Sequence, residues 1–109
     1  MPCVKALCVL VGVWLGDHGY DASHRDAVLV YIERESGFDP DVVSRNGVCL
    51  YQWAGQRRRA ILARGACPDW RTQVEFADVE LHGPFAGFWR SPDPARHMRE
   101  HFGRGVLDR

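Results

Sequence analysis

Short amphipathic segments, separated by glycine and proline, run through the whole sequence. In the first two segments apolar residues recur at i, i+3, i+4 and i+7, which is the spacing of a helix with one buried face, and each later segment turns a smaller set of apolar residues inward. Residues 39–53 break this spacing and mix turn formers with short β-prone pieces. The segments with helical spacing are 4–15, 23–35, 56–64, 69–82 and 93–102. We therefore predict a mainly α (α+β) domain of about five helices around one core, with residues 39–53 as an irregular or short β element.

Length and charge restrict the class of protein further. The 109 residues fit one domain, 1–109, and 46% hydrophobic with 26% charged residues is typical of a globular chain. The 14 basic and 14 acidic residues cancel. A balanced chain lacks the positive field of nucleic-acid-binding proteins, so no nucleic-acid partner is expected.

The first segment allows two interpretations. Residues 6–16 are uncharged and follow Lys5, as in the core of a signal peptide, but no A-x-A-like cleavage site follows and the run is too short to span a bilayer. An apolar stripe at helical spacing favours a buried first helix instead. The stripe consists of Val4, Leu7, Cys8, Val11, Trp14 and Leu15.

Four cysteines allow three pairings and leave the redox compartment open. A bridge between Cys49 and Cys67 would close the most useful loop. Cys3 and Cys8, five residues apart on a predicted helix, should point to different sides and remain apart.

The second segment, residues 23–35, ends on a glutamate, Glu35. We predict a helix that begins at Ser23 and is stopped by Gly37 and Pro40. Glu35 continues the apolar stripe of this helix, whereas Glu33 lies on the opposite face. Glu35 is therefore expected to be half-buried and Glu33 to be solvated.

The later helices show conventional start and stop signals. Asp69 is a suitable cap for the 69–82 helix, and Pro94 a suitable first residue for the last helix, which ends at Gly103. The basic residues of the 56–64 helix are most simply its solvated face: Arg57, Arg58, Arg59 and Arg64.

A specific string of motifs follows the glutamate. It reads E-S-G-F-x-P from Glu35, S-x-x-G from Ser44 and L-Y-Q-W-x-G-x-R from Leu50. Over roughly residues 23–103 the chain resembles the lysozyme-like superfamily of soluble lytic transglycosylases and phage tail lysozymes. One position departs from that pattern, because the family usually has glycine where this chain has Cys49. If the position needs a positive φ, cysteine strains the loop.

The resemblance implies a function. Glu35 matches the catalytic glutamate, and the implied substrate is the β-1,4 bond between N-acetylmuramic acid and N-acetylglucosamine in peptidoglycan, cleaved without a cofactor. Gln52 is implied to line the cleft. Tyr51 and Trp53 offer flat faces that could stack on sugar rings or pack in the core, and Ser44 could contact sugar or make a turn.

Independent chemistry supports the acid. Cleavage of an acetal near neutral pH needs a protonated carboxyl group, and partial burial against apolar side chains raises a glutamate's pKa. This logic is the standard account of lysozyme, from which we borrow it. The alternative is that Glu35 only caps its helix or forms a salt bridge there.

The sequence does not decide how the sugar carbon is attacked after the glycosidic oxygen is protonated. A hydrolase typically needs a second carboxylate, for which Asp39 and Asp41 are the nearest candidates, although both also suit a turn around Pro40. Resemblance to transglycosylases, which use one glutamate and form a 1,6-anhydro product, removes that need. Arg57 could pin the loop to a helix or contact carboxylates of the wall peptides.

Two other functions compete. Residues 97–101 match H-x-x-E-H, a zinc-protease pattern, but no third ligand is evident, and we predict no metal. A lysozyme-fold module that does not cut, and instead binds peptidoglycan or a phage-tail or secretion component, is the main alternative, and Cys49 is the feature that raises it. Either peptidoglycan function places the protein in the cell envelope, periplasmic or extracellular, and is compatible with a larger assembly.

Overall fold

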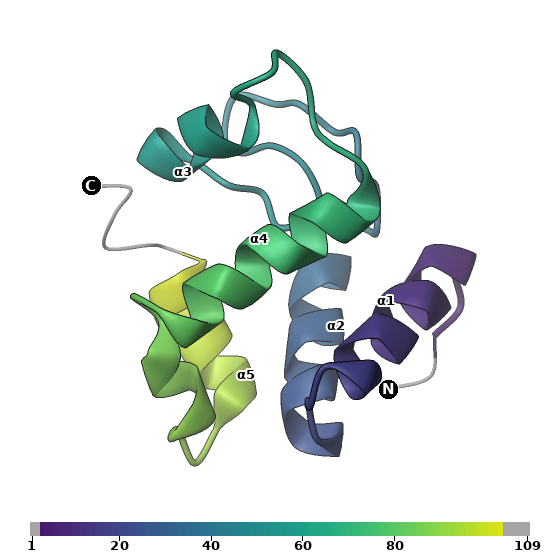
Figure 1. Ribbon diagram of the computed structural model, residues 1–109, viewed down its shortest axis with the longest axis vertical. Helices are drawn as coiled ribbons and strands as arrows, with labels where there is room; N and C mark the ends of the chain where they lie inside the picture. Colours follow the sequence, from purple (N-terminus) through teal and green to yellow (C-terminus); the bar gives the residue numbers. More distant parts are fainter. Residues whose placement is uncertain (1–2, 104–109) are drawn as a thin grey trace.

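The computed structural model of the protein describes residues 3–103, and they form a small helical bundle (Figure 1). The predicted mainly helical architecture with five α-helices is confirmed. Residues 39–53 contain two isolated antiparallel bridges, Val43 to Val48 and Val48 to Trp53, as expected of a short β element. The helices are α1 (Ala6–Asp17), α2 (Ala22–Ser36), α3 (Gly55–Ile61), α4 (Trp70–His82) and α5 (Pro94–His97), with a 3-10 turn η1 (Ala86–Trp89) and a π-helical turn η2 (Met98–Phe102).

Helix α2 lies at the centre of the bundle. It contacts α1 on one side and α5 and η2 on the other, while α4 crosses its upper part (Figure 1). Its inward residues Val28 and Ile32 are fully buried. The loop of residues 39–53 and α3 lie together beyond α4, at the end of the molecule towards which α2 points.

Helix α1 packs through Cys8, Val11 and Leu15, which are buried as predicted. Val4 was predicted to continue this stripe, but it precedes the helix and is 95% exposed. The helix begins only at Ala6, so Val4 lacks the helical backbone that would turn it inward. No helix within residues 3–103 is long and apolar enough to cross a membrane.

Two disulfides join the four cysteines. The predicted bridge between Cys49 and Cys67 is confirmed. The expectation that Cys3 and Cys8 remain apart is wrong, because they are bonded with their Cα atoms 5.5 Å apart. Cys3 lies in the segment before α1 rather than on the helix, so the argument from helical spacing does not apply to it. Such bridges persist in oxidising compartments.

Helix α2 begins at Ala22, one residue earlier than predicted. The cap is Asp21 rather than Ser23: its carboxylate accepts a hydrogen bond from the His24 backbone N–H at 3.0 Å. The predicted stop is confirmed, since Gly37 adopts φ 63° immediately after the helix.

A buried ion pair joins α3 to α4. Arg57 is 4% exposed, and its Nε donates to Glu80 Oε2 at 2.6 Å. Its guanidinium also donates to the carbonyl of Phe102 at 2.7 Å. The expectation that Arg57 belongs to the solvated face of its helix is therefore wrong. Its role is structural, but it joins α3 to α4 and η2 rather than the 39–53 loop to a helix.

The chain returns to α2 through its last helical segment. Asp93 caps α5 by accepting from the Arg96 backbone N–H at 3.1 Å, and Pro94 is the first helical residue, as predicted. Met98 and Phe102 of η2 are buried in the core. Gly103 ends the helix and packs closely on Tyr31: a Cβ there would lie 3.1 Å from the tyrosine ring.

Candidate active site at the end of helix α2

Glu35 lies in the last turn of α2, next to the residue that ends the helix. Its side chain is exposed, so the expectation of a half-buried acid is wrong in terms of area. Its surroundings nevertheless remove part of its hydration, and this desolvation raises the pKa of Glu35 above its ordinary value. A hydrogen bond from the Tyr31 hydroxyl, one turn earlier, opposes the rise. The chain thus carries a solvent-accessible acid whose pKa lies above that of an ordinary glutamate.

Tyr31 connects this acid to the rest of the molecule. It is 5% exposed, and its hydroxyl also lies 3.3 Å from the backbone carbonyl of Tyr51, which is a second acceptor for the same proton. Its ring meets Phe102 edge to face at 5.5 Å. Burial, and then the nearby charge of Glu35, raise the pKa of Tyr31, which keeps its phenol protonated and able to donate. The turn that carries Glu35, the 39–53 loop and η2 therefore meet at this side chain.

The end of α2 is fixed from both sides of the sequence. Ser36 donates back to the carbonyl of Ile32 at 3.3 Å. Lys5, which precedes α1, donates to the carbonyl of Gly37 at 2.7 Å and to Glu33 at 3.3 Å. A cation at a helix C-terminus satisfies a free carbonyl and opposes the helix dipole. The sequence gives no local sign of this contact, because Lys5 and Gly37 are 32 residues apart.

The loop after Pro40 needs a left-handed backbone where the resemblance expects glycine. Cys49 has φ 66°, so the position does need a positive φ and the condition for strain is met. Gln52 also has a positive φ, 55°, and its side-chain amide donates to the carbonyl of Cys49 at 3.0 Å. Gly47 lies against Gln52, and a Cβ at Gly47 would approach its backbone oxygen to 2.8 Å. Gln52, predicted to line a cleft, is half-buried and braces its own loop.

The two aromatic residues beside Gln52 belong to the core. Tyr51 and Trp53 are each 1% exposed, and their rings lie 4.9 Å apart. The indole Nε1 of Trp53 donates to Glu80 Oε1 at 2.8 Å. Neither ring has a free face, which corrects the prediction that they stack on sugar rings and favours the alternative of core packing.

The other candidates for substrate contact shape turns. The hydroxyl of Ser44 donates to the carbonyl of Gly47 at 3.0 Å. The carboxylate of Asp39 accepts from the backbone N–H of Asp41 at 2.9 Å, across Pro40. These contacts match the turn-forming interpretation of Ser44, Asp39 and Asp41.

The sequence analysis did not identify Gln73, which anchors the 39–53 loop to α4. Gln73 of α4 is fully buried, and its Oε1 accepts from the backbone N–H of Leu50 at 2.8 Å. Its Nε2 donates to the carbonyls of Pro40 at 2.8 Å and Pro68 at 2.7 Å. Gln73 and Glu80 lie seven residues apart on the inward face of α4. Polar residues at that spacing on an otherwise apolar stripe were the signal available for both.

The H-x-x-E-H pattern forms no metal centre in the part of the chain that the structure describes. The rings of His97 and His101 lie 4.6 Å apart, but no three histidine, cysteine or acidic side chains come together within residues 3–103. Burial, and then the neighbouring His101, lower the pKa of His97.

Comparisons with known proteins leave the family open. No family model matches the chain, and no curated protein or solved structure matches it significantly. The resemblance therefore rests on the motif residues between Glu35 and Arg57, and the activity it implies remains a proposal.

Proposed function

We propose that the protein is a peptidoglycan-cleaving enzyme, a muramidase or lytic transglycosylase, with Glu35 as its general acid. The observation that carries the proposal is a glutamate that is open to solvent and yet has a raised pKa, at the end of α2. A glycosidic oxygen can reach such a group, and a raised pKa keeps more of it protonated near neutral pH. No cofactor takes part in this chemistry.

The local geometry supports one glutamate rather than a carboxylate pair. Glu35 would give its proton to the glycosidic oxygen as the bond from that oxygen to the N-acetylmuramic acid carbon breaks. The N-acetylglucosamine side of the strand would leave as an alcohol. The resulting Glu35 carboxylate would then accept a proton from the group that attacks the sugar carbon. Since Asp39 is engaged with the backbone of its own turn, we favour attack by the sugar's internal hydroxyl, which gives a 1,6-anhydro product.

A catalytically weak or inactive module is the second candidate. The observation that favours it is the burial of Tyr51 and Trp53, which leaves the loop without an aromatic face for a glycan. Such a module would hold peptidoglycan, or a component of a phage tail or secretion machine, without cutting. Both candidates fit a protein stabilised by two disulfides, and we propose a periplasmic or extracellular location in the cell envelope.

Product analysis tests the proposal. Purified peptidoglycan is incubated with the wild type, with Glu35→Gln and with Glu33→Gln, and the soluble products are identified by mass spectrometry. Glu33 is a matched control, because it is an exposed glutamate of the same helix. We expect soluble muropeptides from the wild type and the Glu33 variant and none from the Glu35 variant, with anhydro ends identifying a transglycosylase and reducing ends a hydrolase.

Two results would contradict the enzymatic proposal. Equal products from Glu35→Gln, which keeps the size of the side chain, would remove Glu35 from the mechanism. Retention of the protein on peptidoglycan without soluble product, from the wild type as well, would establish the binding module instead.

A further inference from the structure

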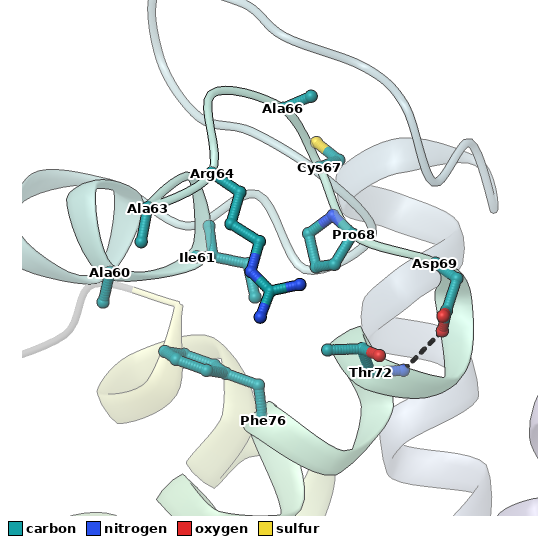
Figure 2. A pocket seen from close by; sticks show the side chains of 10 residues that line it. All are labelled: Ala60, Ile61, Ala63, Arg64, Ala66, Cys67, Pro68, Asp69, Thr72 and Phe76. Atoms are coloured by element: carbon teal, nitrogen blue, oxygen red, sulfur yellow. Dashed lines mark hydrogen bonds between the residues drawn. The ribbon is translucent and has the colours of Figure 1, made fainter.

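A cavity of about 570 Å³ lies between the end of α3 and the start of α4, away from the residues that the motifs single out (Figure 2). Its volume is in the range of pockets for small ligands. Its wall is polar and apolar in similar measure, with several small side chains and with Phe76 as the one aromatic ring. The lining residues are Ala60, Ile61, Ala63, Arg64, Ala66, Cys67, Pro68, Asp69, Thr72 and Phe76.

One cation points into this cavity. Figure 2 shows the guanidinium of Arg64 reaching in from the turn that follows α3, between Phe76, Pro68 and Thr72. Arg64 forms no ion pair with any of the residues 3–103. The acidic residue of the wall, Asp69, is already engaged as the cap of α4 and accepts from the Thr72 backbone N–H at 2.8 Å.

This arrangement suits a particular ligand chemistry. A guanidinium presents a planar fork of donors that matches a carboxylate. A single arginine beside a capping carboxylate is a poor match for a phosphate, which carries more charge and needs more donors. The alanine-rich wall leaves room for small apolar groups, and the Thr72 hydroxyl, which donates to Asp69, can still accept from an amide N–H.

We propose that this cavity binds the free C-terminal carboxylate of a short peptide with small apolar side chains, with Arg64 as the carboxylate ligand. The inference rests on the proposed function, because the glycan strands of peptidoglycan carry short peptides. It adds a peptide-binding site to the proposed cleavage site.

A disulfide and hydrogen bonds connect the wall of the cavity to the 39–53 loop, which follows the end of α2. Cys67 of its wall is bonded to Cys49, whose carbonyl accepts from Gln52. Pro68 of its wall and Pro40, which follows the end of α2, accept from the same amide nitrogen of Gln73. A peptide held in the cavity would therefore be fixed relative to the glycan at the end of α2.

Titration with a soluble peptide tests the site. The probe is N-acetyl-alanyl-alanine with a free carboxylate, in its L,L and D,D forms, followed by calorimetry or by amide NMR shifts. The same peptide with a C-terminal amide is the matched control ligand. Arg64→Gln removes the cation, and Arg59→Gln is the matched control variant, because Arg59 is exposed on α3 and does not line the cavity.

We expect the free acid in at least one chiral form to bind the wild type and Arg59→Gln with similar affinity. Replacing the peptide carboxylate by the neutral amide, or removing Arg64, should weaken binding by about tenfold or more, as for a charge-assisted hydrogen bond. Equal binding of acid and amide, equal binding by Arg64→Gln, or no binding at millimolar peptide would each overturn the proposal.

The two proposals fail separately, since this titration requires no glycan cleavage. An enzyme that cleaves peptidoglycan but ignores the peptide would refute only the peptide site. A protein that binds the peptide but releases no muropeptides would refute only the proposed catalytic function.

Discussion

The ion pair between Arg57 and Glu80 should account for a large part of the stability of the fold. Glu80 is 7% exposed, and its carboxylate accepts from two guanidinium nitrogens of Arg57, at 2.6 Å and 2.9 Å, and from the Trp53 indole at 2.8 Å. Glu80→Gln keeps the size of the side chain and an acceptor for the indole but leaves the buried guanidinium without a counter-charge. Breaking such a pair on one side costs about 3–5 kcal/mol. We therefore expect the free energy of unfolding to fall by about 3 kcal/mol or more.

Urea unfolding without reductant, followed by tryptophan fluorescence, measures this loss while both disulfides stay closed. Glu75→Gln is the matched control, since Glu75 is exposed on the same helix, and it should change the free energy of unfolding by less than about 0.5 kcal/mol. The double variant Arg57→Met with Glu80→Leu should cost less than Glu80→Gln alone, because it leaves no unpaired buried charge. A loss below about 1 kcal/mol for Glu80→Gln would refute the inference that the Arg57 guanidinium is desolvated.

Three further predictions follow from Glu35 and its loop. Because the pKa of Glu35 is raised by folding, its ionisation opposes folding, and Glu35→Gln should be more stable than the wild type at pH 7. The difference should shrink as the pH falls and vanish below about pH 4, near the unfolded pKa, as parallel thermal melts would show. Tyr31→Phe removes the hydrogen bond that lowers the pKa of Glu35, so the alkaline limb of the cleavage rate should move to higher pH; an unchanged limb would count against this contact. Of two variants without the second disulfide, Cys49→Gly with Cys67→Ser should be more stable than Cys49→Ser with Cys67→Ser by about 1 kcal/mol, since φ is 66° at this position, and equal urea midpoints would contradict the strain argument.

The candidate site could be predicted from the sequence only in part. The motif and the stripe of α2 placed Glu35 at the end of its helix, and the glycine position of the resemblance indicated a positive φ at Cys49. The solvent exposure of individual side chains was harder to predict than these local features. Glu35 is more open than expected. Tyr51 and Trp53 are more buried than expected, because Phe102 of η2 and Phe76 of α4 pack against their rings.

The sequence alone determined those features that depend on residues a few positions apart. The caps Asp69 and Asp93, the stop at Gly37 and the helical stripes follow from hydrogen bonds and spacing within one or two turns. Only the tertiary structure decided where charges and sulfurs find partners. Arg57 meets Glu80 23 residues away, and Lys5 meets Gly37 32 residues away. The energy of a charged group depends on whether packing brings a partner and excludes water, and no local pattern carries that information.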